Sequence, residues 1–375
     1  MPARLNTTVR PDCGARIEQL RARLKRKKID ALLVSRPENR RYLSGYRAPD
    51  HGINETSGVL FIPVRERARL LTDFRYKLQA EEETSLPVTL YQKGVLALLG
   101  DIFSQGNIRR FAFESHYTLH SFGLKLAALA EKHKIELVPV TDLVERQRLI
   151  KSEEEIELLR RSTALNEEVF QYIHRRLSAD MTEIETAAAI ESRMRQSGAE
   201  GPSFSTIVAS GENGALPHAV PTNKVIGKNS AVTIDMGLVL NGYCSDMTRN
   251  FVVGTADKTY THIHRIVRKA QLAGIAAVKP GSQMNEVDRA ARKIIADSGY
   301  GKYFGHALGH GVGLAVHEAP SLSFRSRRKL KPGMIVTVEP GIYVPGWGGI
   351  RLENMVVVRE DGCEVLNNDT TYLDI

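Results

Sequence analysis

The sequence predicts two domains: an α/β domain at the N-terminus and an α+β domain at the C-terminus that contains an internal pseudo-twofold repeat. The chain of 375 residues is long enough for two hydrophobic cores. Its first part alternates amphipathic helices with short apolar strands, and its second part carries one series of motifs twice. We place the domains at residues 1–147 and 148–375.

The composition is that of a globular protein. Hydrophobic residues make up 42% and charged residues 25% of the chain, which is close to the average and excludes disordered and fibrous classes. No apolar run approaches the roughly 18 residues of a membrane span, and the first dozen residues lack the apolar core of a signal peptide. The three cysteines are too few and too scattered for a disulfide framework. We therefore expect a cytoplasmic protein with reduced thiols and no membrane partner.

The net charge of +9 raises the question of an anionic partner. The basic residues are dispersed, however, with only short clusters such as residues 23–28 and 325–329, and aromatic residues do not alternate with them. This pattern indicates a solvated surface rather than a nucleic-acid site.

Residues 17–142 predict the N-terminal α/β domain. This segment contains no glycine-rich phosphate loop and no cluster of acids or histidines, so we expect it to serve packing, oligomerisation or the shaping of a pocket. Apolar runs predict strands at residues 31–34, 59–63, 68–72 and 111–114, and amphipathic periods predict helices at residues 17–28 and 119–133.

The C-terminal domain begins with two helix-start signals. Ser152 with Glu155, and Thr182 with Glu185, have the spacing of capping boxes, in which the hydroxyl accepts the amide proton three residues later. Gly198 suits the end of the second helix.

A β-hairpin follows at residues 232–253. Two apolar runs flank Asn241-Gly242, the strongest short hairpin signal, and a two-residue turn there puts Asp235 and Asp246 on one face as diagonal neighbours. Like charges this close raise each other's pKa, so such a pair either shares a proton or binds a cation. Taken alone, the pair also fits a solvated hairpin end.

The hairpin has a second copy. Residues 336–341 repeat the pattern of residues 232–237 at an offset of 104 positions, with Glu339 in the place of Asp235. The return strand, residues 350–358, carries Glu353 where the first copy carries Asp246.

The repeat extends upstream of the hairpins. Residues 181–185 match residues 284–288 at an offset of 103 positions, and His218 matches His317 at an offset of 99. Two copies of helix, histidine loop and acidic hairpin predict a site on a pseudo-twofold axis where four carboxylates and two histidines converge.

Two further histidines lie in a glycine-rich segment, residues 305–313, that follows two predicted helices at residues 260–278 and 284–297. Its four glycines disfavour a helix by about 1 kcal/mol each and are typical of close backbone approach. His306 and His310, with His317 shortly after, reach the density of a metal site.

These residues resemble the pita-bread metallopeptidase family, which includes methionine aminopeptidase, aminopeptidase P and prolidase. The resemblance spans the whole chain, and residues 39–45 and 72–76 look like the creatinase-type domain of the proline-specific members. It implies the pita-bread fold for the C-terminal domain. The family's ligand order Asp, Asp, His, Glu, Glu maps onto Asp235, Asp246, His310, Glu339 and Glu353.

The resemblance also implies the chemistry. The ligands would hold two divalent ions, with Mn²⁺ preferred over Co²⁺ or Zn²⁺, which agrees with a carboxylate-rich donor set. Glu339 would also accept a proton from the attacking water, and His218 and His317 would steady the oxyanion and the peptide nitrogen. The residues implied to line the substrate pocket are His306, Tyr343 and Arg351, although Arg351 can equally serve to neutralise excess carboxylate charge.

We therefore expect a homodimeric exopeptidase that hydrolyses Xaa-Pro bonds at peptide N-termini, in the manner of aminopeptidase P. The alternative enzyme is an Xaa-Pro dipeptidase, and the alternative from another class is a non-catalytic binding module of the same fold. Many prolidases of the family carry an arginine shortly after the His-Glu-x-Pro segment, where it can clamp a dipeptide carboxylate. This chain has Ser321 there, which favours longer peptides.

Overall fold

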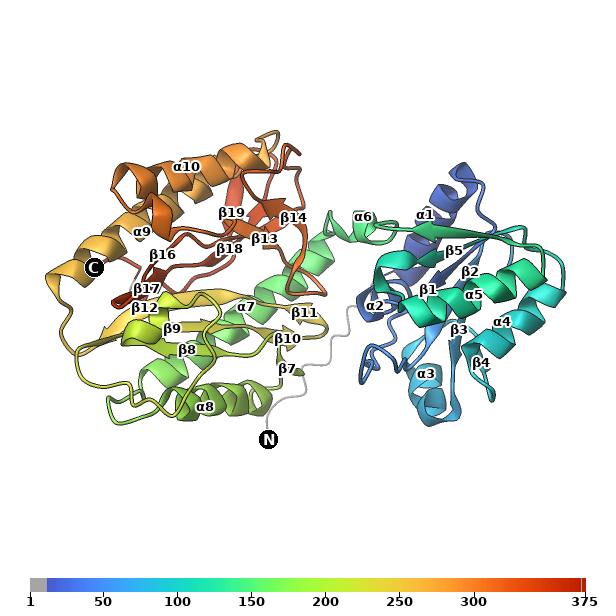
Figure 1. Ribbon diagram of the computed structural model, residues 1–375, viewed down its shortest axis with the longest axis horizontal. Coiled ribbons are helices and arrows are strands. Elements are labelled where there is room, and N and C mark those ends of the chain that lie inside the picture. The colour runs from blue at the N-terminus through green and yellow to red at the C-terminus, as the bar shows by residue number, and fades with distance from the viewer. Residues whose placement is uncertain (1–11, 372) are drawn as a thin grey trace. The chain divides into compact units, whose positions relative to one another are not determined.

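The computed structural model describes residues 12–371 and 373–375. Residues 1–11, which belong to the N-terminal segment for which we predict no signal peptide, lie outside the described residues. The chain forms two compact units, Met1–Arg148 and Leu149–Ile375 (Figure 1). The domain boundary that we propose, between residues 147 and 148, lies beside this division.

The first unit contains one mixed six-stranded sheet in the order β4-β3-β2-β1-β5-β6, with helices on it (Figure 1). Strand β1 pairs antiparallel with β2 and parallel with β5. The predicted α/β class is therefore confirmed. The strands are β1 (Ala31–Val34), β2 (Val59–Pro63), β3 (Arg69–Thr72), β4 (Val88–Leu90), β5 (Arg110–Glu114) and β6 (Glu136–Val140). The helices are α1 (Cys13–Arg26), α2 (Pro37–Ser44), η1 (Phe74–Tyr76), α3 (Lys77–Glu83), α4 (Val95–Ser104), η2 (Ser115–Tyr117), α5 (His120–Lys132) and α6 (Glu145–Arg148).

The four strands predicted for this unit are confirmed, and both predicted helices are present with ends shifted by one to four residues. The sequence analysis missed β4, β6, α2, α3, α4 and α6. No residue of β4 or β6 is fully buried. Neither strand therefore needs the long apolar run by which a buried strand is found in a sequence. Helix α4, VLALLGDIFS, is apolar at most positions, so its apolar residues do not show the spacing of three and four that marks an amphipathic helix.

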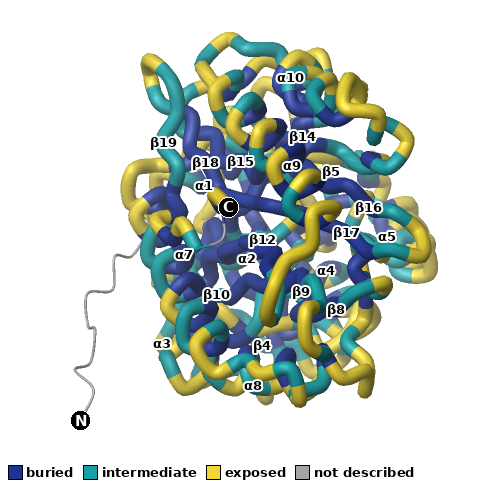
Figure 2. The backbone as a smooth tube through the Cα atoms, turned by 90° about the vertical axis from the view of Figure 1, so that its left-hand side faces the viewer, coloured by how far each residue is buried: buried dark blue, intermediate teal, exposed yellow. Residues whose placement is uncertain are grey.

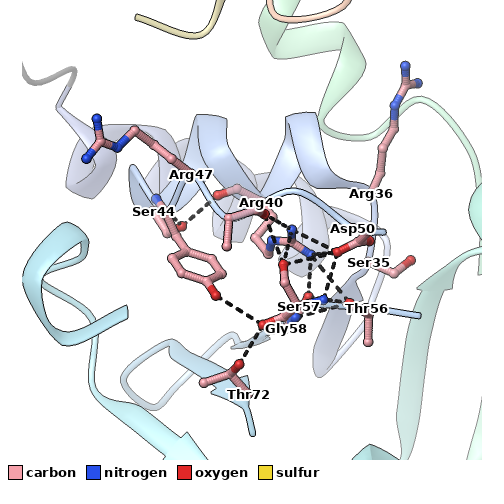
Figure 3. A network of polar contacts seen from close by, with 12 residues as sticks. Ser35, Arg36, Arg40, Ser44, Arg47, Asp50, Thr56, Ser57, Gly58 and Thr72 are labelled. Atoms are coloured by element: carbon pink, nitrogen blue, oxygen red, sulfur yellow. Dashed lines mark hydrogen bonds and ion pairs between the residues drawn. The ribbon is translucent and has the colours of Figure 1, made fainter. Parts of the chain in front are cut away.

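Arg40 organises the connection between α2 and β2 (Figure 3). Its side chain is fully buried, and its guanidinium donates to the carbonyl oxygens of Ala48 and Gly58, to the hydroxyl of Ser57 at 2.7 Å and to the carboxylate of Asp50 at 3.0 Å. A planar group with five N–H donors suits several acceptors at once. Arg40 thus fixes an irregular connection that has few backbone hydrogen bonds of its own.

The second unit has two halves, each made of two helices and a set of strands (Figure 1). In the first half, α7 (Glu153–His174) and α8 (Glu183–Gln196) pack with β8, β9 and β12 around Phe170 and Ile234. In the second half, α9 (Lys258–Ala277) and α10 (Met284–Asp297) pack with β15 and β18 around Val287 and Val356. The helices predicted in both halves are therefore confirmed.

The strands of the second unit form four sheets, in the orders β11-β10-β7, β12-β9-β8, β14-β13-β15-β18-β19 and β16-β17. The first-half strands are β7 (Gly201–Pro202), β8 (Ile207–Ser210), β9 (Ser230–Met236), β10 (Leu238–Leu240), β11 (Tyr243–Cys244) and β12 (Met247–Val253). The second-half strands are β13 (Gly309–Gly311), β14 (Glu318–Leu322), β15 (Ile335–Val338), β16 (Gly341–Val344), β17 (Gly348–Arg351), β18 (Asn354–Val358) and β19 (Cys363–Val365). Two 3₁₀ turns complete the unit, η3 (Gly211–Ala215) and η4 (Gly301–Tyr303).

Both capping boxes are confirmed. Ser152 accepts from the Glu155 amide and Thr182 from the Glu185 amide, and each glutamate returns a bond to the cap residue. Most strand residues of the second unit are buried, and the outer faces of its helices are exposed (Figure 2). Within the described residues, no helix is long and apolar enough to cross a membrane.

The first hairpin has the predicted register. Leu240 pairs with Tyr243 across a two-residue turn whose residues Asn241 and Gly242 have φ values of 51° and 84°. These positive φ values are those of a type I′ turn, whose backbone twist matches the twist of the two flanking strands. The same register continues through β9 and β12, which puts Asp235 and Asp246 on one face as predicted.

The second hairpin corrects one expectation. Its pairing places Glu339 directly opposite Glu353, whereas Asp235 lies opposite Thr248. Glu353 therefore corresponds in register to Thr248, and the predicted correspondence with Asp246 is wrong by two residues. The connection of this hairpin is one residue longer, since three residues separate Val344 from Gly348 and two separate Leu240 from Tyr243. Arg351, opposite Gly341, occupies the position that corresponds to Asp246. A shift of two residues keeps a side chain on the same face, so Glu353 still points into the site.

Candidate metal centre

One cavity of about 460 Å³ lies in the second unit, between the two halves. It is lined by elements of both copies of the repeat. All the residues singled out from the sequence contribute to its wall: His218, Asp235, Asp246, His306, His310, His317, Glu339, Tyr343, Arg351 and Glu353.

The first hairpin supplies two buried carboxylates to the cavity. Asp235 lies near the end of β9 and Asp246 just before β12, with exposed fractions of 9% and 4%. The Oδ2 atom of Asp235 accepts from Arg351 at 2.6 Å. Its Oδ1 atom is buried and has no hydrogen-bond partner among the residues that the structure describes. A buried anionic oxygen without a donor is costly unless a cation satisfies it.

The second hairpin supplies two more carboxylates, each oriented by a threonine. Thr337 Oγ1 donates to Glu339 at 3.0 Å, and Thr248 Oγ1 donates to Glu353 at 2.7 Å. Each bond fixes one carboxylate oxygen and leaves the other available for a ligand. Sequence analysis missed both threonines. The position of Thr248, opposite Asp235 in the hairpin, is the signal that would have found it.

His310 lies on β13 and faces these acids. Its Nε2 atom lies 3.3 Å from Glu339 Oε1 and 3.6 Å from Asp246 Oδ2. Its Nδ1 atom lies 3.1 Å from the carbonyl oxygen of Gly311, which can only accept, so Nδ1 carries the proton. Burial lowers the pKa of His310 and keeps the ring neutral. The lone pair of Nε2 is therefore directed at the carboxylates, as a metal ligand requires.

The carboxylates repel one another strongly. Burial first, and then the charges of Glu353, Asp235 and Glu339, raise the pKa of Asp246 well above its usual range. Burial raises the pKa of Glu339 to about 8, and burial with the charges of Glu339 and Asp235 raises the pKa of Glu353.

The donor set fits divalent cations. Ligand atoms of Asp246, His310 and Glu353 all lie within 4.8 Å of one another, so one ion can reach all three. With Asp235 and Glu339, the set holds four carboxylates and one imidazole, a combination that suits Mn²⁺-like ions. Divalent charge relieves the repulsion between the acids and satisfies the unpartnered Asp235 oxygen.

A chain of hydrogen bonds forms one wall of the cavity. Arg351 donates to Tyr343 Oη at 2.8 Å and to Asp235, and Tyr343 Oη lies 2.9 Å from His306 Nε2. His306 Nδ1 lies 2.8 Å from the carbonyl oxygen of Ala307 and therefore carries the proton, so the tyrosine hydroxyl donates to Nε2. Burial lowers the pKa of His306 to about 4, which keeps it a neutral acceptor. Arg351 thus lies on the wall of the cavity and is paired with the carboxylate of Asp235.

The two histidines of the repeat lie beside the donor set. His317 packs edge-on against His310 with ring centroids 4.3 Å apart, and His218 comes from the connection between η3 and β9. Burial, and then the nearby rings of His310 and His218, lower the pKa of His317. A neutral His317 ring can donate a hydrogen bond from one ring nitrogen and accept one at the other.

Comparison with known proteins assigns the class. Residues 157–360 match Metallopeptidase family M24, and residues 16–150 match the Creatinase/Prolidase N-terminal domain. The chain therefore belongs to metallopeptidase family M24, with a creatinase/prolidase-type N-terminal domain and the pita-bread fold, as the sequence resemblance implied.

Particular relatives are similar over nearly the whole length. A solved Xaa-Pro dipeptidase from Bacillus anthracis has a TM-score of 0.89 at 37% identity, covering 96% of this chain and 98% of its own. An X-Pro aminopeptidase from Thermotoga maritima MSB8 has a TM-score of 0.84 at 35% identity, covering 92% and 98%. The Xaa-Pro dipeptidase of Pyrococcus furiosus is 35% identical over 356 residues, which are 94% of this chain and 97% of that protein.

Proposed function

We propose that the protein is a two-metal exopeptidase that hydrolyses Xaa-Pro bonds. One observation carries the proposal: five donor side chains from both repeats, with an unpartnered Asp235 oxygen among them, meet two further histidines in one cavity. The names of the relatives supply the Xaa-Pro bond as the target. A binding module would have no need of this donor set.

The proposed ligands are Asp235, Asp246, His310, Glu339 and Glu353. When bound, two divalent ions supply Lewis-acid polarisation and a water of lowered pKa. Mn²⁺ is the ion that we propose, with Co²⁺ or Zn²⁺ as alternatives, because carboxylates dominate the set.

Other groups of the chain handle protons and charge. Glu339 accepts the proton of the attacking water, and Thr337 Oγ1 holds its carboxylate in place with a hydrogen bond of 3.0 Å. His218 and His317 stabilise the oxyanion and donate to the departing proline nitrogen. His306, Tyr343 and Arg351 form the wall against which the substrate rests, and their mutual hydrogen bonds hold it rigid.

Two observations bear on substrate length. Relatives named Xaa-Pro dipeptidase favour the dipeptidase alternative over the aminopeptidase that the sequence analysis preferred. The cavity favours longer peptides, because Ser321 stands on its wall and the only described cation there, Arg351, is already bonded to Asp235, Tyr343 and Thr248. A dipeptide carboxylate would have to compete for this arginine.

Hydrolysis of a peptide panel with added Mn²⁺ tests both points. The panel runs from Xaa-Pro dipeptides through Xaa-Pro-Yaa tripeptides to longer Xaa-Pro peptides, with Xaa-Ala peptides as controls. Cleavage of Xaa-Pro bonds alone supports the proposal, and no cleavage of any member contradicts it. A preference for dipeptides of about tenfold in kcat/KM, or about 1.4 kcal/mol, assigns a dipeptidase.

We also propose a cytoplasmic homodimer acting on peptides, without a nucleic-acid or membrane partner. Sedimentation analysis of the purified chain tests the oligomeric state.

A further inference from the structure

A buried glutamate, Glu183, opens helix α8 outside the cavity. Its side chain does not contact the proposed metal ligands, and its exposed fraction is 0%. Burial normally raises the pKa of a carboxyl group. Here hydrogen bonds from Ser210, Thr222 and Asn213 outweigh burial and lower the pKa of Glu183, so the group stays ionised.

The carboxylate joins two points of the chain that flank His218. Its Oε1 atom accepts from the backbone and hydroxyl of Ser210, at 2.7 and 2.9 Å, and from Asn213 at 2.9 Å. Its Oε2 atom accepts from Asn213 at 3.0 Å and from the backbone and hydroxyl of Thr222, at 3.1 and 2.7 Å. Both oxygens are therefore saturated with donors. We call residues 210–222 the His218 loop.

The backbone of α8 supports the same loop. The amides of Glu183 and Ile184 donate to the carbonyl oxygens of Lys224 and Thr222, each at 3.0 Å. On the far side, η3 packs against β17 so closely that a Cβ on Gly349 would stand 2.0 Å from the carbonyl oxygen of Gly214. The loop is thus held between α8 and the strand that carries Arg351.

The second half holds a cavity histidine in a similar way. Asp288 of α10, with an exposed fraction of 0%, accepts from the Leu308 amide at 3.1 Å. It also pairs with Arg292, which donates to the carbonyl oxygens of Phe304 at 2.8 Å and His306 at 2.7 Å. In both halves a buried acid on the helix fixes the backbone around a histidine.

We propose that Glu183 is a positioning residue, which fixes both ends of the His218 loop and so sets the place of the His218 ring opposite the carboxylates. This inference rests on the proposed function, in which His218 acts in catalysis. A misplacement of about 1 Å in a reacting group can cost about 10² in rate. Loss of the hydrogen bonds of Glu183 would displace the His218 ring and thereby lower kcat.

Glu183→Gln is the test variant. A glutamine side chain has one acceptor oxygen, and its amide nitrogen would face a donor at either Ser210 or Thr222, so one end of the loop is released. We expect kcat to fall about tenfold, KM to change by less than about twofold and bound metal to stay the same. Glu185→Gln is the matched control, because it lies on the same helical turn, bonds only to Thr182 among the described residues and retains its capping function as glutamine.

A double-mutant cycle with His218→Ala separates positioning from a general structural effect. If Glu183 acts through His218, Glu183→Gln lowers kcat about tenfold in the parent enzyme and less than about twofold in the His218→Ala background. The same factor in both backgrounds would overturn the proposal. If Glu183→Gln does not fold, Thr222→Val takes its place in the cycle, with a smaller fall of about threefold expected.

Hydrogen exchange gives a readout that does not depend on activity. The amides of Ser210 and Thr222, which donate to Glu183, should exchange faster in Glu183→Gln than in Glu185→Gln. Equal exchange in both variants refutes the positioning role. Full activity of His218→Ala, or no Xaa-Pro hydrolysis by the parent, instead refutes the proposed function, and the exchange result then decides whether Glu183 holds the loop.

Discussion

The carboxylates of the cavity are held together against their own repulsion. Replacing one of them, as in Asp246→Asn, removes a ligand and also a carboxyl group whose pKa is raised by burial and by the charges of Glu353, Asp235 and Glu339. We expect this variant to lose bound metal and activity while its metal-free form is at least as heat-stable as metal-free parent protein. Metal analysis and thermal unfolding measure the two effects. Retained metal with retained activity would contradict the ligand assignment.

The paired histidines should separate catalysis from metal binding. His218→Ala and His317→Ala are each expected to lower kcat by about 10², which is typical of an oxyanion donor or proton-transfer group. Metal content should stay near that of the parent, since neither ring belongs to the proposed ligand set. Loss of metal from either variant would make that histidine a ligand.

The contact between η3 and β17 depends on the absence of a side chain at Gly349. In Gly349→Ala the new Cβ would stand 2.0 Å from a backbone oxygen, so one of the two segments must move. We expect a destabilisation of about 1–3 kcal/mol, as for other overpacked sites, measured by chemical denaturation. Gly362→Ala is the control, because a Cβ at that residue would have nothing within 4 Å and its φ is ordinary. Equal stability of the two variants would show that the contact is not tight in solution.

Local chemistry made much of this fold predictable from the sequence. The capping boxes at Ser152 and Thr182 and the turn at Asn241-Gly242 act over three or four residues, and their partners are visible in the sequence itself. The repeat displays the hairpin acids twice, as well as the pair His218 and His317, whereas His306 and His310 stood out by their glycine-rich segment. The register of the second hairpin was not predictable in this way, because it depends on the length of the turn between β16 and β17, which has no Asn-Gly signal.

Other parts depend on contacts between distant residues. Thr248 orients Glu353, which lies 105 positions further along the chain, and Glu183 holds residues 27 to 39 positions away. Such roles leave no local pattern, because a buried threonine or glutamate looks like any polar residue in a sequence. In the N-terminal unit, Arg40 is a similar case: its acceptors lie in a connection that has no regular structure of its own.

Metal removal should make the stability of the whole protein dependent on pH. In the metal-free protein the pKa of Glu339 is about 8, and the pKa values of Asp246 and Glu353 are also raised. Burial lowers the pKa values of His306, His310 and His317, so below about pH 6.5 these histidines bind fewer protons in the folded state and oppose the carboxyl groups. Between about pH 6.5 and pH 8 unfolded histidines and carboxyl groups have both lost their protons, so there the folded state binds more protons than the unfolded state. Stability of the metal-free form should therefore fall as the pH rises through this window.

Thermal unfolding of chelator-treated protein at several pH values measures this dependence. We expect the unfolding temperature to fall as the pH rises, and to fall less steeply in a metal-free Glu353→Gln variant, which lacks one of the raised groups. A stability that rises with pH over the same window would contradict the raised pKa values of these carboxyl groups.

The turn at Asn241-Gly242 has a consequence for the ageing of the protein. Asparagine followed by glycine is the sequence most prone to deamidation, because the glycine nitrogen can attack the side-chain amide and form a succinimide. Here that nitrogen belongs to a buried residue and donates to Glu200 at 2.8 Å, so the hairpin withholds the nucleophile while it is folded. Deamidation at Asn241 should therefore accumulate only in molecules that have opened this hairpin, and its extent would record how long a sample has spent unfolded.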